Sequence, residues 1–400
     1  MEYIPKQEIL ERYAKVLVNF ALNSGNGIKP GEVVLCNVPD IAKPLLKELQ
    51  IAILKSGGRL ITNLIPTGLD ADYYLNASDE QLKFFPKEYL KERVKLIDHT
   101  INIYSINDIH ELEKVNHEKI LLAKKSKKEY AEWLTKKEQS GKYTWTIALW
   151  GTEAMASEVG LTIEQYWEQI ISACFLDQPD PITNWKNIYT QQFEIRKKLN
   201  ELEIVELKVI GEDSDLKIKL GIDRVWNGGS GRNIPSFEIF TSPDWRGTEG
   251  WIKLNQPLYR DGHVIKDIRL EFVKGRVVSF KAGQGEKYLE NMLLTSNADK
   301  LGEFSLTDKR FSRIHKFMAN TLYDENIGGT FGNTHIALGR AYLECYRGDV
   351  SKLTPAKQDK LGFNNSVEHC DVISTTDRTV IATTSKKKEI IIYEKGEFTI

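Results

Sequence analysis

Two side chains near the C-terminal end of the sequence have the types and spacing of metal ligands. His369 and Asp371 are two residues apart in SVEHCDVIS, a segment with strand character. Alternate residues of a strand project from the same face, so the imidazole and the carboxylate would point the same way. Imidazole nitrogen and carboxylate oxygen both suit Zn, Co or Mn. The pair therefore indicates a divalent-cation site.

Four further acidic or histidine residues in the same half of the chain could complete this site. Taken alone, a glutamate in a strand usually lies on the solvated face, because glutamate is seldom fully buried. A single loop histidine is equally ordinary. Here each candidate stands beside glycine-rich or strand-end sequence. The four are Glu238, Glu303, Glu325 and His335.

Six ligands are too many for one tetrahedral zinc ion and suit two ions that share bridging groups. Two divalent ions would cancel the charge of the four carboxylates, which would otherwise repel one another at close range. Pairs of metal ions occur in hydrolases, where the two ions hold a water molecule whose pKa is lowered enough to supply hydroxide near neutral pH. We therefore expect two divalent metal ions, Zn, Co, Mn or Mg.

The residues alone leave other functions open. A dinuclear metal phosphoesterase would use the same ligands, although the sequence has no evident cluster of Arg or Lys beside them to bind phosphate. A non-catalytic protein could instead hold a structural cation with these carboxylates and bind a small ligand through its N-terminal half.

Five motifs, in this order, resemble the thermophilic metallo-aminopeptidase family of the aminopeptidase T, S and II type. They are RNIPSFEIFTSP, DIRLEFVKGRVV, LGEFSL, DENIGGTFGNTHIALGRAY and HCD. The resemblance covers essentially the whole chain, and its specific part spans residues 232–371. It implies a cytosolic homodimeric exopeptidase that removes the N-terminal residue from peptides with a free N-terminus by means of two divalent metals. It also implies an α/β N-terminal domain and a C-terminal catalytic domain.

Carried over by position, the resemblance assigns the metal ligands to Glu238, Glu303, Glu325, His335, His369 and Asp371. It also assigns a catalytic role to Tyr342, in the GRAY stretch. A neutral phenol with a pKa near ~10 can donate a hydrogen bond to a developing oxyanion. Glu303 is the candidate to accept the proton of the attacking water. The sequence departs from the family pattern at Phe237, where glycine is common.

The first half of the chain alternates helical and strand patterns. Short apolar runs at residues 31–38, 59–66, 100–106 and 143–150 are separated by segments with helical periodicity. This alternation is typical of a parallel sheet covered by helices on both faces. The turn after the first of these strands, NVPDIAKP, has no glycine, which disfavours a dinucleotide-binding site.

The second half of the chain has a different pattern of helices and strands. Helices are expected over 162–175 and 181–201, and strand patterns dominate from residue 203, including strands over 204–211 and 215–222. Lys274-Gly275 predicts a hairpin, and the last residues, EIIIYEKGEFTI, predict another. We expect an open α/β domain at residues 1–185 and a mixed α+β catalytic domain at residues 186–400.

Composition excludes several classes of protein. Lys and Arg number 55 against 56 Asp and Glu, for a net charge of −1, whereas binding nucleic acid usually needs a basic surface. No run approaches the ~18 apolar residues of a membrane-spanning helix, and the N-terminal residues do not resemble a secretory signal. Four widely spaced cysteines are expected to be buried, reduced thiols. We therefore expect a cytoplasmic protein without nucleic-acid or membrane partners.

Overall fold

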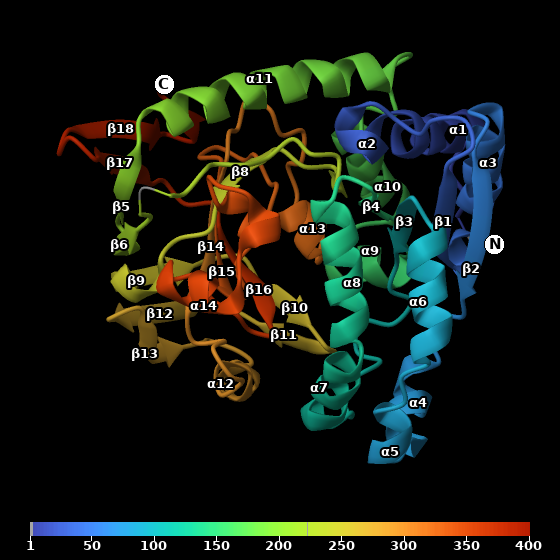
Figure 1. Ribbon diagram of the computed structural model, residues 1–400, viewed down its shortest axis with the longest axis horizontal. Coiled ribbons are helices and arrows are strands. Elements are labelled where there is room, and N and C mark those ends of the chain that lie inside the picture. The colour runs from blue at the N-terminus through green and yellow to red at the C-terminus, as the bar shows by residue number, and fades with distance from the viewer. Residues whose placement is uncertain (1–2, 222) are drawn as a thin grey trace. The chain divides into compact units, whose positions relative to one another are not determined.

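The computed structural model describes residues 3–221 and 223–400. By its contacts, the chain forms two compact units (Figure 1). The first contains the residues up to Asn187 together with Ser230–Pro235, and the second contains Ile188–Gly229 and Ser236–Ile400. The domain division expected between residues 185 and 186 stays a prediction. The last residue of the strand expected over 215–222 lies outside the described residues.

The first unit is built on a five-stranded parallel sheet with the order β2-β1-β3-β4-β7. Its strands are β1 (Val33–Pro39), β2 (Arg59–Ile65), β3 (His99–Tyr104), β4 (Thr144–Leu149) and β7 (Asn233–Ile234). The four strands predicted from apolar runs all form, within two residues of their expected bounds. The strand β7 is the addition, since only two residues of a later loop pair with β4.

Helices precede, connect and follow these strands along the chain. They are α1 (Gln7–Val16), the π-helix Leu17–Ala21, α2 (Leu22–Gly25), α3 (Lys43–Lys55), α4 (Asp70–Asn76), α5 (Asp79–Leu82), α6 (Lys87–Leu96), α7 (His117–Ser126), α8 (Lys128–Gln139), α9 (Glu153–Glu158), α10 (Ile163–Ala173) and α11 (Pro181–Glu201). The helix α3 packs on β1 and β2, burying Leu45, Leu49 and Ile53 at helical spacing. On β1, Val33 and Leu35 belong to a buried cluster against which Leu134 of α8 packs.

The second unit contains two larger antiparallel sheets and a small one. The eight-stranded sheet has the order β13-β12-β9-β6-β5-β17-β18-β19, the four-stranded sheet β16-β15-β14-β8, and β10 pairs with β11. The strands are β5 (Ile204–Gly211), β6 (Ser214–Lys219), β8 (Glu238–Thr241), β9 (Glu249–Leu254), β10 (Leu258–Arg260), β11 (His263–Ile265), β12 (Ile268–Val273), β13 (Arg276–Lys281), β14 (Leu301–Thr307), β15 (Asn333–Gly339), β16 (His369–Ser374), β17 (Thr379–Thr384), β18 (Glu389–Glu394) and β19 (Glu397–Phe398).

Short helices connect these strands, namely α12 (Glu286–Leu293), α13 (Thr321–Asp324) and α14 (Pro355–Lys360). Both predicted hairpins are confirmed. Lys274 and Gly275 join β12 to β13, and Lys395 and Gly396 join β18 to β19. All four of these residues have positive φ, as a two-residue hairpin turn of type I′ requires.

The predicted fold class, an α/β part followed by a mixed α+β part, is confirmed by these sheets. All four cysteines are buried free thiols, as expected. Within the described ranges, no helix is both long enough and apolar enough to cross a membrane.

Candidate metal centre

The two strands at one side of the four-stranded sheet place three of the predicted ligands on one face. In the antiparallel pairing of β15 with β16, Ala337 lies opposite Asp371 and Gly339 lies opposite His369. Alternate residues share a face, so His335 projects from the same face as both of these pairs. Alanine and glycine are small, and they leave room beside the two larger ligands.

The other two strands add the two glutamates. Glu303 of β14 lies opposite Ala337, and Thr307 lies opposite Glu238, the first residue of β8. Ser305, between Glu303 and Thr307, lies opposite His335. All four strands therefore contribute predicted ligands from one face of the sheet. The alternation of side chains that predicted a shared face for His369 and Asp371 holds for the other strands as well.

Glu325 reaches this face from outside the sheet. It is the residue at the C-terminal end of α13, and it is buried. The hydroxyl of Thr307 donates a hydrogen bond to its carbonyl at 3.3 Å. This bond ties the loop that follows α13 to the last residue of β14.

The structure brings all six predicted ligands together. They form three overlapping groups in which the ligand atoms lie within 4.8 Å of one another. The groups are Glu238, Glu303 and His335; Glu303, His369 and Asp371; and Glu325, His335 and Asp371. Glu303, His335 and Asp371 each belong to two groups, so the three groups form one continuous cluster.

Glu303 spans the cluster with its two carboxylate oxygens. Its Oε1 lies 3.8 Å from Nε2 of His335, and its Oε2 lies 3.3 Å from Nε2 of His369. His335 also contacts Glu238 at 3.3 Å, and His369 contacts Asp371 at 3.3 Å. Each imidazole therefore lies between two carboxylates, and Glu303 is common to both.

Burial and neighbouring groups shift the pKa values of His335, Glu325 and Glu238. Burial would lower the pKa of His335, but hydrogen bonds to Glu238 and Glu303 outweigh it and raise that pKa well above its ordinary value. Burial raises the pKa of Glu325 well above the ordinary range, and the charges of Glu238 and Asp371 raise it further. Burial likewise raises the pKa of Glu238, more than its hydrogen bond to His335 lowers it. Burial and the neighbouring carboxylates thus disfavour the charged forms of Glu238 and Glu325 when no cation is bound.

The pKa values of His369 and Asp371 each shift toward the charged form of the residue. Burial opposes the charged form of His369, yet the carboxylates of Asp371 and Glu303 raise its pKa well above the ordinary value. Burial would raise the pKa of Asp371, but His369, His335 and Arg260 lower it to about 2. Asp371 is therefore ionised at any pH near neutrality.

The donor set fits divalent metal ions. Four carboxylates carry a charge of −4, and two imidazolium groups would offset only half of it. Nδ1 of His335 is a buried atom for which no hydrogen-bond partner is found in the described part of the chain. Carboxylate oxygens and imidazole nitrogens are the ligands that Zn, Co and Mn take. The residues present thus suit the metal that the sequence predicts.

Tyr342, the predicted catalytic tyrosine, lies beside this cluster. Its ring centroid is 4.8 Å from that of His369, and its side chain is 38% exposed. Its backbone N–H donates to Oγ of Ser242 at 2.8 Å, which fixes the residue at the start of a 3-10 turn. Burial raises the pKa of Tyr342 well above its ordinary value, and the negative charges of Glu303 and Asp371 raise it further. The phenol therefore stays protonated at neutral pH.

Sequence reasoning missed the residues that support the ligands. Ser305 donates to Oε2 of Glu238 at 3.0 Å, and its position two residues after Glu303 is the signal that could have identified it. Arg260 donates to the carbonyl of His369 at 2.9 Å and forms an ion pair with the buried Glu368. No local pattern marks Arg260, because its partners lie more than a hundred residues later in the chain.

Comparisons with known proteins agree with these features. The sequence pattern of the thermophilic metalloprotease (M29) family matches residues 6–398. Aminopeptidase PepS of Streptococcus thermophilus is 25% identical over 98% of this chain and 98% of its own length. Aminopeptidase 2 of Geobacillus stearothermophilus is 26% identical over 97% of each chain. The solved structure of wild-type AmpT from Thermus thermophilus has a TM-score of 0.84 and 23% identity, over 98% of this chain and 100% of that one. At that identity, it demonstrates a shared fold.

The Arg260–Glu368 pair yields a stability prediction. Arg260→Met should lower the free energy of unfolding of the metal-free protein by about 3–5 kcal/mol, because it leaves Glu368 buried without its cation. Arg260→Met combined with Glu368→Gln should cost less than the sum of the two single changes. Urea unfolding measures all three variants. Lys217→Met, in a more exposed pair with Glu206, is the control and should cost about 0–1 kcal/mol. Strictly additive effects of the two buried changes would contradict the coupling.

Proposed function

This chain belongs to the thermophilic metalloprotease (M29) family, and from that membership and the geometry of the metal centre we propose how it acts. It is an aminopeptidase that hydrolyses the N-terminal residue from peptides with a free N-terminus, using two divalent metal ions and a bridging water. The observation that carries this proposal is Glu303, whose two oxygens face different histidines at 3.8 and 3.3 Å. One carboxylate that faces two ligand groups suits a pair of metal ions, because each of its oxygens could bind a different ion.

The family of this chain and its enzyme class are established by the comparisons. The family resemblance expected from the five motifs is confirmed by the match over residues 6–398. The enzyme class, a metallo-exopeptidase, is likewise confirmed by that family and by the relatives, which are named aminopeptidases. The number of metal ions, their identity and the role of each ligand are our proposals.

The proposed ligands are the six clustered residues, Glu238, Glu303, Glu325, His335, His369 and Asp371. When bound, divalent ions such as Zn, Co, Mn or Mg would polarise the scissile carbonyl and lower the pKa of the water between them. A metal ion or an acidic residue would hold the free amine of a substrate. Recognition of that amine would explain why cleavage begins at the N-terminus.

Glu303 is the proposed proton acceptor. It is buried, and it belongs to two of the three ligand groups, so its carboxylate stands where those groups meet. From this position it would accept the proton of the attacking water and later return it to the leaving amine. A carboxylate shared between two groups can do so while one of its oxygens keeps its contact with histidine.

Tyr342 is the proposed donor to the oxyanion. Its ring lies 4.8 Å from that of His369, and burial followed by the charges of Glu303 and Asp371 raises the pKa of its phenol, which favours the protonated form that can donate. The bond from its backbone N–H to Ser242 and the packing of its ring on Phe240 and His369 hold the residue beside the cluster. A donor held in advance stabilises negative charge that develops only in the transition state.

We further propose that the protein is a homodimer, formed through the edge strand β2. This strand ends the parallel sheet, and it is exposed along most of its length. Leu64 and Ile65, at the end of this strand, are exposed by 46% and 42%. An exposed apolar edge strand can pair with the same strand of a second copy around a two-fold axis. A cytoplasmic location is part of the proposal, which the four free thiols support.

Metal dependence tests the proposed activity. Protein stripped with a chelator should release no amino acid from an aminoacyl anilide, and Zn, Co or Mn should restore release. An N-blocked anilide and a phosphodiester should remain uncleaved. Glu303→Ala and His369→Ala should abolish activity, whereas Glu48→Gln, which changes a buried glutamate of α3, should retain it. Metal-independent release, or equal cleavage of the blocked substrate, would overturn the proposal.

Replacing Tyr342 separates its role from metal binding. Tyr342→Phe should lower kcat by about 10²–10³-fold, because it removes one donor to the oxyanion. KM and the amount of metal bound should change little. Steady-state kinetics and metal analysis measure both quantities. Tyr346→Phe, on the same turn, is the matched control and should keep its kcat. An unchanged kcat in Tyr342→Phe would remove the tyrosine from the mechanism.

Light scattering after size exclusion tests the dimer. The wild-type protein should have twice the mass of one chain, and Leu64→Lys should give monomers at micromolar concentration, because a charge would be buried at the edge of the sheet. Leu294→Lys changes a leucine that is 78% exposed in the second unit, so it should remain dimeric. A dimeric Leu64→Lys variant would exclude this interface.

A further inference from the structure

The C-terminal hairpin, residues 389–398, places one tyrosine hydroxyl against the strands that carry the ligands. Tyr393 of β18 is fully buried. Its hydroxyl donates to the carbonyl of Thr307 at 2.8 Å and lies 3.3 Å from the carbonyl of Phe331. The backbone N–H of Asn333 bonds to the same oxygen. Thr307 and Asn333 are cross-strand partners, so this hydroxyl closes the last rung of the β14–β15 ladder.

Two glycines allow this close approach. Gly332 has a φ of 63°, and a Cβ atom there would overlap the hydroxyl of Tyr393 and the carbonyl of Thr307. Gly396 has a φ of 80°, and a Cβ atom there would overlap the backbone of Phe331. The hairpin and the loop before β15 therefore touch backbone to backbone, which leaves no space for a larger residue in either segment.

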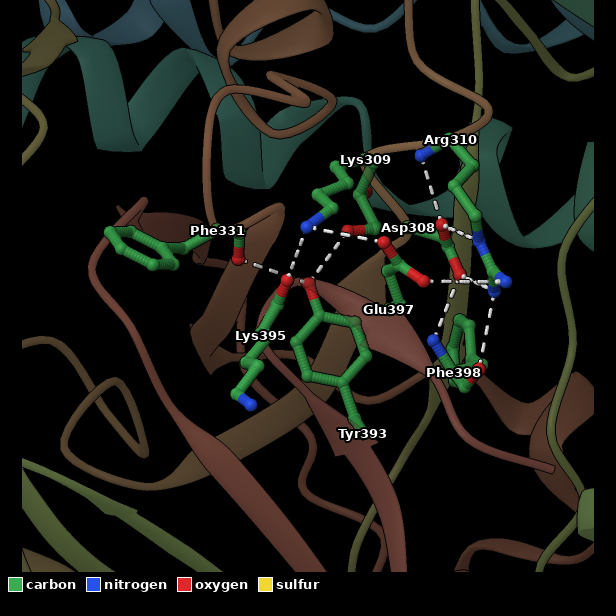
Figure 2. Close-up of polar contacts among 9 residues, drawn as sticks. Asp308, Lys309, Arg310, Phe331, Tyr393, Lys395, Glu397 and Phe398 are labelled. Carbon is green, nitrogen blue, oxygen red and sulfur yellow. Dashed lines mark hydrogen bonds and ion pairs between the residues drawn. The ribbon is translucent and has the colours of Figure 1, made fainter.

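Polar contacts fasten the turn of the hairpin to the residues after β14, as Figure 2 shows. The N–H of Lys309 donates to the carbonyl of Gly396 at 2.9 Å, and its ammonium donates to the carbonyl of Lys395 at 2.8 Å. The buried carboxylate of Asp308 accepts from the N–H of Phe398 at 2.8 Å and from Nε of Arg310 at 2.8 Å. The hairpin thus adds to the second unit at a fixed position rather than as a loose tail.

The anchored residues are direct neighbours of the ligands. Thr307 lies opposite Glu238 in the sheet, and its hydroxyl holds the carbonyl of Glu325. Asn333, two residues before His335, donates through its side chain to the carbonyl of Asp324 at 2.8 Å. Any displacement of Thr307 or Asn333 would therefore pass to three of the six ligands.

We propose that the C-terminal hairpin positions the metal centre, and that Tyr393 is its positioning residue. By holding Thr307 and the loop over 325–335, it fixes Glu325 and His335 on the same face as Glu238. This inference rests on the proposed function, in which these residues hold metal. Tyr393 itself touches neither the ligand atoms nor the substrate, so it acts only through their backbone.

Tyr393→Phe tests the proposal, because it removes one hydroxyl and keeps the ring that packs on Phe398. Competition of the protein with a chelator for Zn should show metal affinity lowered by about 10-fold, the lower end of the loss for groups bonded directly to ligand side chains. The Co-loaded variant should also have an altered absorption spectrum. Tyr143→Phe is the matched control, since it removes a buried hydroxyl bonded to Thr100 in the first unit. It should leave both readouts at the wild-type level.

Gly396→Ala provides a second test through the backbone contact, and it should weaken Zn binding in the same way. Gly31→Ala is its control, because Gly31 has a φ of 86° but open space around it. Wild-type Zn affinity in both Tyr393→Phe and Gly396→Ala would overturn the positioning role, even if both variants unfold more easily. That result with an active wild-type enzyme defeats this inference alone. A wild-type protein that binds no metal would defeat the proposed function and this inference together.

Discussion

The second unit depends on holding four carboxylates within a few ångströms of one another on one buried face of a sheet. Two like charges about 4 Å apart interact with ~4 kcal/mol at an effective dielectric of about 20, a large share of a domain's stability of about 5–15 kcal/mol. Two histidines can offset only half of the charge. The cluster responds by titration, since burial raises the pKa of Glu238 and Glu325, while Asp371 remains ionised beside His369. Without metal the carboxylates can relieve this repulsion only by taking up protons, whereas divalent cations would neutralise them in their charged form, which is the physical reason that the face suits such cations.

The surroundings of the ligands hold them in place against this repulsion. Small residues, Ala337 and Gly339, lie opposite the ligands of β16 and give them room. Hydrogen bonds to backbone carbonyls then fix the strands, from Arg260 to His369 and from Tyr393 to Thr307. These contacts do not involve the ligand atoms themselves. The positions of these side chains therefore do not rely on metal alone, and Nε2 of both histidines still faces the carboxylates of the cluster.

The sequence predicted what depends on local pattern. The apolar runs located the four main parallel strands, and the spacing of His369 and Asp371 located their shared face. What it missed depends on contacts between distant residues. Ser305 and Glu238 are 67 residues apart, Tyr393 and Thr307 are 86 apart, and Arg260 and His369 are 109 apart. Glu325 comes from outside the sheet, so strand periodicity could not place it, and the sequence marked it only by its residue type, the glycine-rich segment after it and the family motif. The alternation of apolar and polar residues predicts that a segment forms a strand, but not which other strands it pairs with.

The same separations determine how the centre forms. Its ligands run from Glu238 to Asp371, and the hairpin that closes the β14–β15 ladder ends at Phe398. Contacts that close long loops form late, because the loop entropy is lost before the contact repays it. In the unfolded chain the carboxylates are solvated and apart, and they meet only where these distant strands pair. Metal ions that bind them would therefore stabilise the folded second unit as well.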